Sequence, residues 1–136
     1  RNLFSYLKEK NIDCIVATHD QNDALSFADK LIIIKDNKIL ENDTPKEIYS
    51  TPKEKYIAAL FDDVNEIIIN NTNVLLYPHQ ILVVEKSDLE ATVLKSYFKG
   101  SYWLIEVEFN AQKVFFNHSL EIKKNAKINL KISKKF

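Results

Sequence analysis

The chain has 136 residues, of which 46% are hydrophobic and 28% are charged, so it holds one modest core or two small ones and is typical of a soluble globular protein. Nineteen basic residues balance nineteen acidic ones, which argues against a nucleic-acid or membrane-surface protein driven by bulk charge and leaves only local patches. The only glycine is Gly100, so the glycine-rich loops that cradle phosphates are absent from these residues.

The ends of the sequence and its single cysteine give further limits. Methionine is absent and the chain begins at Arg1 in helix-like sequence, so we expect a piece of a longer protein. Cys14 has no internal disulfide partner, and the flanking Ile15–Ala17 run favours core packing over a reactive thiol and fits a reducing cytosol. The longest apolar runs have about five residues, far below the length of a membrane-spanning helix, and we expect no secretory leader.

The first half predicts alternating helix and strand. A short helix ends near Lys10, and the continuous apolar run Cys14–Thr18 predicts a strand of a parallel sheet, covered on both faces. The strand ends at His19, after which Asp20 is placed to cap an amphipathic helix. The apolar face of that helix consists of Ala24, Phe27, Ala28 and Leu31.

Turn and capping signals then follow one another. Runs 31–34 and 38–40 predict a hairpin around Asp36-Asn37, because these residue types tolerate positive φ angles. The segments Thr44–Glu47 and Thr51–Glu54 each have the pattern of a capping box with proline at the first helical position, so two short helices are predicted. The second would present Ile57, Leu60 and Phe61 as its apolar side.

The second half predicts short strands. They are expected at 67–69, 74–77, 81–84, 90–98, 102–109, 113–116 and 127–132. Gly100 lies at the turn between two of these strands, and Trp103 to Phe109 alternates between a core face and a mostly wet face that includes Glu106. So many short strands leave exposed edges in an open sheet, and a small closed or partly closed barrel is therefore predicted.

The first half resembles the C-terminal end of an ABC transporter nucleotide-binding subunit. The resemblance rests on the run Ile15-Val16-Ala17-Thr18-His19-Asp20-Gln21, on Ala24, Ala28-Asp29-Lys30 and the hairpin, and on Thr44-Pro45, Glu47-Ile48-Tyr49, Thr51-Pro52 and Tyr56-Ile57-Ala58. The segment Leu76–Ile81 is similar to part of the transport-associated OB-like domain, TOBE, of importers. The family usually has glycine where this chain has Asn37, and Tyr77 replaces the TOBE-like arginine, which weakens any anion-binding role there.

The resemblance implies an α+β protein in two parts. Residues 1–61 would be a truncated α/β (RecA-like) tail of an ABC ATPase domain, and residues 62–136 a small OB-like β-barrel with a regulatory role. His19 would be the switch histidine that contacts the γ-phosphate of ATP, since a residue at the carboxyl end of a buried parallel strand points into the ligand crevice.

The resemblance also sets expectations for the complete protein. It would use ATP and Mg²⁺, couple hydrolysis to solute import through membrane permease subunits, pair with a second ATPase subunit as a homodimer, and lie in the cytoplasm, peripheral to the inner face of the membrane. Walker A, Walker B and signature motifs are absent from these residues, so this chain alone is expected neither to bind ATP tightly nor to hydrolyse it.

Two alternative functions stay open. One is a stand-alone regulatory or solute-sensing module whose pocket would be lined by Tyr97, Phe98, Tyr102, Phe115 and Phe116. The other is an OB-type binder of single-stranded nucleic acid that uses the C-terminal lysines, although those lysines also suit the wet face of an edge strand, and no nucleic acid is expected as a partner. No metal site is predicted, because His79 and His118 lack ligands at metal-binding spacing.

Overall fold

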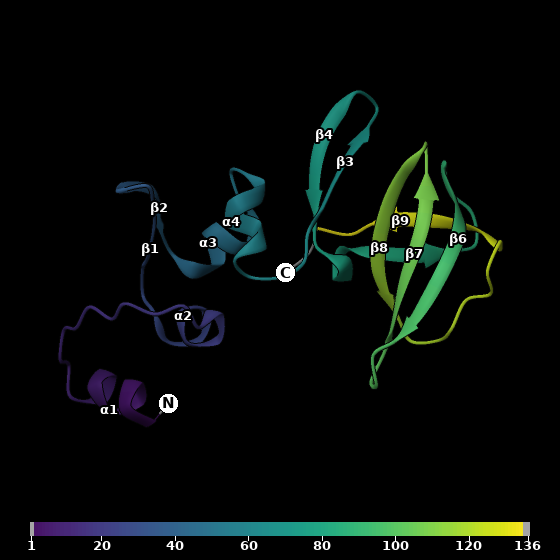
Figure 1. Cartoon of the computed structure of the whole chain (residues 1–136). Coiled ribbons are helices and arrows are strands. Elements are labelled where there is room, and N and C mark those ends of the chain that lie inside the picture. The colour runs from purple at the N-terminus through teal and green to yellow at the C-terminus, as the bar shows by residue number, and fades with distance from the viewer. Residues whose placement is uncertain (1, 135–136) are drawn as a thin grey trace. The chain divides into compact units, whose positions relative to one another are not determined.

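The computed structural model describes residues 2–134, which divide into two compact units at the Phe61–Asp62 junction (Figure 1). The first unit contains short helices and one hairpin, and the second is almost entirely β-structure. The protein is therefore mostly β, with few helices and open sheets.

The first unit has a small core between its hairpin and its later helices. Ile33 from the hairpin packs with Ile48, Ile57 and Phe61, all of them buried. In chain order its elements are α1 (Asn2–Glu9), α2 (Gln21–Phe27), β1 (Leu31–Lys35), β2 (Lys38–Asp43), α3 (Pro45–Ser50) and α4 (Lys55–Ala59).

The strand predicted at Cys14–Thr18 is wrong for this chain. Residues 12–20 form no helix or strand and are exposed, with Ile15 99% accessible and the Cys14 thiol on the surface. A parallel strand is stable only when neighbouring strands satisfy its backbone groups and cover its side chains. Within residues 2–134 no strand pairs with this segment, because β1 and β2 pair only with each other.

The two predicted capping boxes have different outcomes. Thr44 caps α3 as expected, and its Oγ1 accepts a hydrogen bond from the Glu47 N–H at 3.3 Å. The Thr44 N–H donates to Asp43 Oδ1 at 2.7 Å, so Glu47 does not complete the box. The second helix starts later than Thr51–Glu54 predicts: α4 begins at Lys55, and its cap residue Glu54 makes no side-chain capping bond. Ile57 and Phe61 are buried as expected, whereas Leu60 is 42% exposed.

The second unit contains every strand that the sequence predicts there. Its elements are β3 (Asn65–Ile69), β4 (Thr72–Leu76), η1 (Pro78–Gln80), β5 (Ile81–Val84), β6 (Leu89–Phe98), β7 (Trp103–Phe109), β8 (Gln112–His118) and β9 (Lys127–Ile132). Five of them form one antiparallel sheet in the order β5-β9-β6-β7-β8, and β3 and β4 form a separate hairpin. Since β9 lies between β5 and β6, its lysines do not belong to an edge strand, contrary to the expectation.

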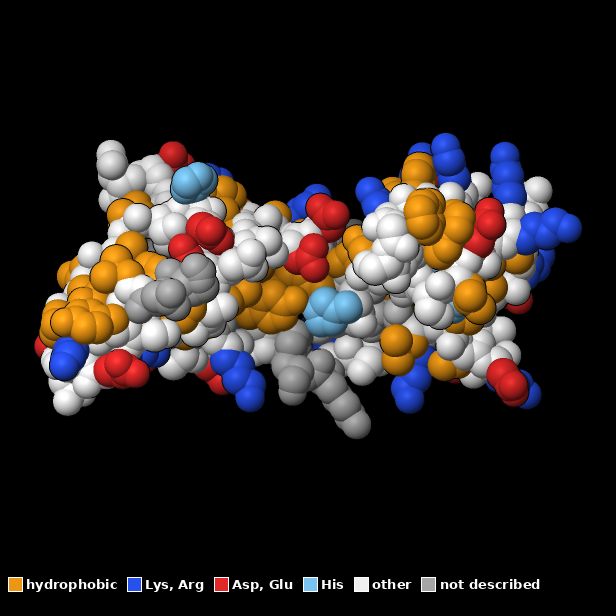
Figure 2. Space-filling view, turned by 90° about the horizontal axis from the view of Figure 1, so that it is seen from below, with side chains coloured by type: hydrophobic (Ala, Val, Ile, Leu, Met, Phe, Trp, Pro, Cys, Tyr) orange, Lys and Arg blue, Asp and Glu red, His pale blue; other side chains and the backbone are white. Residues whose placement is uncertain are grey.

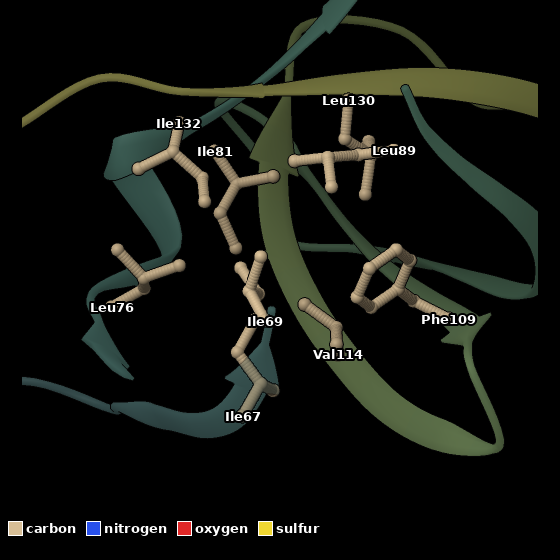
Figure 3. Close-up of a pocket in the computed structure, with 9 residues that line it drawn as sticks. All are labelled: Ile67, Ile69, Leu76, Ile81, Leu89, Phe109, Val114, Leu130 and Ile132. Carbon is tan, nitrogen blue, oxygen red and sulfur yellow. The ribbon is translucent and has the colours of Figure 1, made fainter. Parts of the chain in front are cut away.

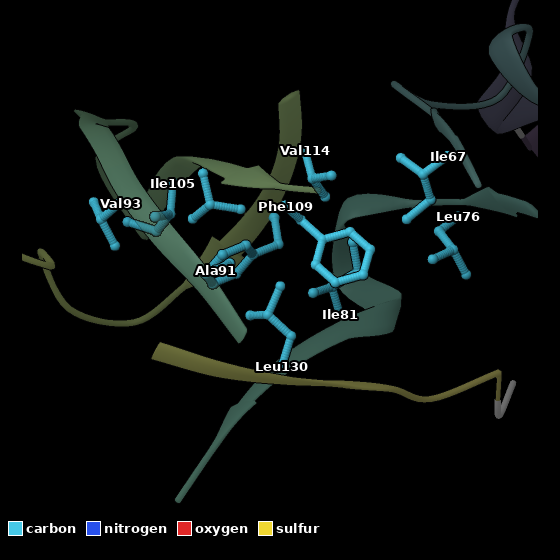
Figure 4. Close-up of a cluster of buried hydrophobic side chains, with 11 residues drawn as sticks. Ile67, Leu76, Ile81, Ala91, Val93, Ile105, Phe109, Val114 and Leu130 are labelled. Carbon is cyan, nitrogen blue, oxygen red and sulfur yellow. The ribbon is translucent and has the colours of Figure 1, made fainter. Parts of the chain in front are cut away.

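One apolar core fills the concave side of this sheet (Figure 4). Val93, Ile105 and Val107 are fully buried, and the core also includes Ile67 and Leu76 from the β3–β4 hairpin. The apolar alternation of β7 is confirmed at Ile105, Val107 and Phe109, all buried. This core is what makes residues from Asp62 onward a unit of their own.

A closed or partly closed barrel is predicted for this half; the described residues form no closed barrel, although the arrangement is consistent with an OB-like domain. The sheet stays open with β5 and β8 as its edges. The β8 edge is instead engaged by side-chain amides. Asn65 bonds the backbone N–H and C=O of Phe115, and Gln112 bonds the backbone of Ile68. The Asn65 amide occupies backbone groups of β8 that a closing strand would use, and the Gln112 amide ties β8 to the β3 backbone.

Positive φ angles mark the tight turns, of which the sequence predicts those at Asp36-Asn37 and Gly100. Three hairpins have two-residue loops in which both residues are left-handed, at Asp36-Asn37, Asn70-Asn71 and Asn110-Ala111. This is the geometry of a type I′ turn, which matches the twist of paired strands. Gly100, with φ +89°, lies in the turn between β6 and β7 as expected.

Candidate functional site

The best-defined candidate site is the turn Thr18-His19-Asp20 ahead of α2. The Asp20 carboxylate caps α2 and accepts hydrogen bonds from the backbone N–H groups of Asn22 at 2.9 Å and Asp23 at 3.4 Å. Thr18 Oγ1 accepts a bond from the Asp20 N–H at 2.9 Å. The backbone is thus fixed on both sides of His19, and Asp20 is confirmed as the helix cap.

His19 itself is exposed to solvent. An imidazole donates a hydrogen bond through an N–H, so at this place it is suited to contact an anionic oxygen of a ligand that approaches from outside. The switch role of His19 stays a prediction.

The other two histidines lie in the second unit. His79 stacks on Tyr77, with ring centroids 5.7 Å apart and planes 9° from parallel. His118 Nδ1 lies 2.9 Å from the Leu120 carbonyl oxygen and 3.2 Å from the Leu120 backbone nitrogen. Among residues 2–134 no group of His, Cys, Asp and Glu is arranged to hold a metal ion, and no helix there is long and apolar enough to cross a membrane.

A small cavity opens into the core of the second unit (Figure 3). Its volume is about 10 Å³, close to the space that one water molecule needs. It is lined only by apolar side chains, namely Ile67, Ile69, Leu76, Ile81, Leu89, Phe109, Val114, Leu130 and Ile132. A cavity of this size and lining does not hold a solute.

The aromatic residues predicted to line a solute pocket do not come together. Phe116 is fully buried in the core, whereas Phe98 is 68% exposed at the end of β6. Tyr97 and Phe115 lie on the opposite face of the sheet from Phe116, because side chains alternate along β6, β7 and β8. None of them lines the cavity described above.

A polar cluster on the outer face of the sheet was missed by the sequence reasoning. Glu106, expected on the wet face, is only 9% exposed. Its carboxylate accepts a hydrogen bond from the Tyr97 hydroxyl at 2.9 Å and pairs with the Lys113 ammonium at 3.6 Å. This hydrogen bond, followed by burial and the charge of Glu106, raises the pKa of Tyr97 above its ordinary value of 10.0. The alternation of residue types along β7 does not indicate that side chains of the neighbouring strands bury Glu106.

Comparison with known proteins gives the relatives of this chain. It is 30% identical over 115 residues to the spermidine/putrescine import ATP-binding protein PotA of Bacillus anthracis, a match that covers 85% of this chain and 34% of PotA. The PotA protein of Malacoplasma penetrans is 29% identical over 75% of this chain and 22% of its own length. That of Aliivibrio fischeri is 38% identical over 58 residues, which are 43% of this chain and 16% of PotA. No family model matches the chain.

Homologues of this chain are ATP-binding subunits of ABC importers. The chain spans about a third of the length of the Bacillus relatives that it matches. The resemblance inferred from the His19 region is thus supported at the level of this subunit class, whereas the TOBE assignment is not.

Proposed function

We propose that the chain is the C-terminal portion of the ATP-binding subunit of an ABC importer. Residues 1–61 complete the ATPase domain, and residues 62–136 form a regulatory, TOBE-type OB-like domain. The observation that carries this proposal is the 30% identity to PotA proteins over 85% of the chain. The names of those relatives make a small polyamine the first solute to test.

The exposed segment before His19 supports the placement in an ATPase domain. Ile12, Ile15 and Val16 are between 48% and 99% exposed, which is costly for three large apolar side chains in one short segment. In the complete subunit this segment is the strand of a RecA-like parallel sheet that the sequence predicts. His19 then lies at the carboxyl end of that strand, where α/β sheets bind their ligands.

Within that subunit His19 is the switch histidine. The bonds of Thr18 and Asp20 hold the backbone from which the imidazole projects. Its N–H donates to a terminal phosphoryl oxygen, where negative charge is redistributed during phosphoryl transfer.

The residues present fit only part of an ATP site. His19 is a suitable donor, but the single glycine of the chain lies in a β-hairpin of the other unit and forms no phosphate-binding loop. ATP and Mg²⁺ are therefore held mainly by parts of the subunit other than these residues. The partners of the complete protein are membrane permease subunits and a second ATPase subunit, which place it on the cytoplasmic side of the membrane.

Substitution of His19 in the complete subunit tests this proposal. We expect His19→Ala to lower ATP hydrolysis by about 100-fold, as the loss of one donor to a developing charge does elsewhere, while ATP still binds. His79→Ala is the matched control, because His79 lies in the other unit. An unchanged hydrolysis rate in His19→Ala, with the melting temperature of the parent protein, would overturn the switch role.

A further inference from the structure

The second unit carries an exposed apolar patch at the end of its sheet where β6 turns into β7. Phe98 and Leu120 are each 68% exposed and Tyr102 is 37% exposed. The Phe98 ring lies against Trp103, with centroids 5.1 Å apart and planes at 56°. We call these four residues the tip patch.

The pairing of the strands explains why these residues gather. Phe98 is opposite Trp103 in the β6–β7 ladder, and Trp103 is opposite His118 in the β7–β8 ladder. The segment after β8 then runs beside β6, since the Ser96 hydroxyl donates to the Ile122 carbonyl at 2.7 Å. Leu120, whose backbone contacts His118 Nδ1, therefore lies at the Phe98 end of β6.

Lysines lie at the tip patch and behind it. Lys99 is in the turn itself. Lys123 and Lys124 lie farther back along β6, between Ile122, which bonds to Ser96, and Asn125, which bonds to Val93. In the two segments that form it, residues 97–104 and 117–125, the exposed cations are Lys99, Lys123 and Lys124 and the only acid is Glu121. These two segments therefore carry an excess of positive charge, whereas the chain as a whole has no net charge. Figure 2, which views the molecule from the lower end of Figure 1, shows hydrophobic side chains on the surface of the β-rich unit with Lys side chains at its rim.

The shape of the tip patch distinguishes between two anionic partners. Single-stranded nucleic acid is held in basic grooves that track its backbone. The tip patch instead lies on a turn that forms the lower end of the sheet in Figure 1. A projecting turn with aliphatic and aromatic side chains, and with lysines behind them, suits a flat apolar layer under a negatively charged surface.

We propose that the tip patch is a contact surface for an anionic lipid bilayer. Phe98 and Leu120 enter the boundary between headgroups and acyl chains, Tyr102 stays at headgroup level, and the three lysines contact anionic headgroups. The surface is independent of the ATPase role proposed above, because all its residues lie in the second unit. A failure of one proposal leaves the other standing.

The only tryptophan of the chain, Trp103, reports on this contact without any label. We expect vesicles of phosphatidylglycerol to shift its emission to shorter wavelength and to carry the chain into the pellet on sedimentation. Vesicles of phosphatidylcholine should do neither, and added salt should weaken the binding.

Two variants separate the apolar and the charged parts. Phe98→Ser with Leu120→Ser should weaken binding by more than about 10-fold, because two large apolar groups no longer enter the bilayer. Lys99→Glu with Lys124→Glu keeps the apolar groups and should weaken it by about 10-fold or more. Ile68→Ser is the matched control, since Ile68 is 55% exposed on β3 and lies outside the tip patch.

Several results would overturn the proposal. These are a chain that stays in solution with phosphatidylglycerol vesicles, variants of the tip patch that bind as the parent chain does, and a control that loses as much binding as they do. Quenching of Trp103 by a single-stranded oligonucleotide without any response to vesicles would assign the surface to nucleic acid instead.

Discussion

Asn65 and Phe115 are joined by two hydrogen bonds between one side-chain amide and one backbone position. The Phe115 N–H donates to Asn65 Oδ1 at 2.8 Å, and Asn65 Nδ2 donates to the Phe115 carbonyl at 2.7 Å. In the opposite direction, the side-chain amide of Gln112 on β8 makes two hydrogen bonds with the backbone of Ile68 on β3. The amide of Asn65 thus pairs with the β8 edge as a neighbouring strand would, and it attaches the β3–β4 hairpin to the sheet.

Asn65→Ala should therefore destabilise the second unit by about 1–3 kcal/mol, because it leaves backbone groups of Phe115 without their partners in a part-buried place. Trp103 fluorescence during urea unfolding measures this unit alone, as the only tryptophan lies in it. Asn73→Ala is the control, since Asn73 makes an exposed bond to Glu66 and its loss should cost about 0.5 kcal/mol or less. Equal effects of the two substitutions would contradict this account.

Ala111 is the residue least suited to its turn. Its φ of 62° is left-handed, and the residues at the same place in the two other hairpins are Asn37 and Asn71. Because a Cβ costs about 1 kcal/mol in this region, Ala111→Gly should stabilise the second unit by up to that amount. Ala126→Gly, at a residue without a positive φ, should lower stability instead. Urea unfolding followed by Trp103 fluorescence measures the change in the free energy of unfolding for each variant, which should be an increase for Ala111→Gly and a decrease for Ala126→Gly.

The hydrogen bond from Tyr97 to Glu106 makes stability depend on pH in the alkaline range. The bond, burial and the charge of Glu106 raise the pKa of Tyr97 in the folded state above 10.0. The contribution is thus fully present below pH 10 and is lost as the pH rises through the folded pKa, since the folded state then binds more protons than the unfolded state. Glu106→Gln removes the carboxylate charge and should lower the pKa of Tyr97.

Ultraviolet titration of tyrosinate measures this pKa. The difference between the parent chain and Tyr97→Phe isolates Tyr97 from the other tyrosines, and Tyr102→Phe serves as the control. A Tyr97 that titrates at its ordinary pKa in the parent chain would contradict the assignment.

Mg-ATP should leave the melting temperature of this chain unchanged. A ligand stabilises a protein only through binding to the folded state, and these residues contain no phosphate-binding loop. The complete subunit is the control, and ATP at 100 times its dissociation constant should stabilise it by about 2.7 kcal/mol. A saturable rise in the melting temperature of the chain itself would show that it holds ATP without those motifs.

Features set by neighbouring residues in the sequence were the ones predicted best. The turn at Asp36-Asn37 and the Asp20 cap depend on side chains that bond or tolerate their own local backbone, and both are confirmed. β6 pairs with β7 across the turn at Gly100 as predicted, whereas the shift of their register between Val93 and Lys95 was not predicted. The sequence therefore predicted the strands of the second unit and the Asp20 cap that follows His19, but not the conformation of the segment before His19.

Features that depend on distant residues were predicted poorly. The bonds of Asn65 join residues 50 positions apart, so no local pattern indicates them. The cover of Glu106 by Tyr97 and Lys113 comes from two neighbouring strands. The apolar composition of Cys14–Thr18 predicts a strand buried on both faces of a sheet. Such a strand needs neighbouring strands to pair with, and residues 2–134 do not supply them.

Cys14 offers a test of that last point, because its state differs between the chain and the proposed subunit. In this chain the thiol is exposed, so a thiol reagent should label it as fast in native buffer as in denaturant. If residues 14–18 form a covered strand in the complete subunit, labelling there must await local opening. An opening free energy of about 3 kcal/mol slows it by about 100-fold. Equally fast labelling in the complete subunit would place the segment outside the sheet and leave His19 without the position that its switch role requires.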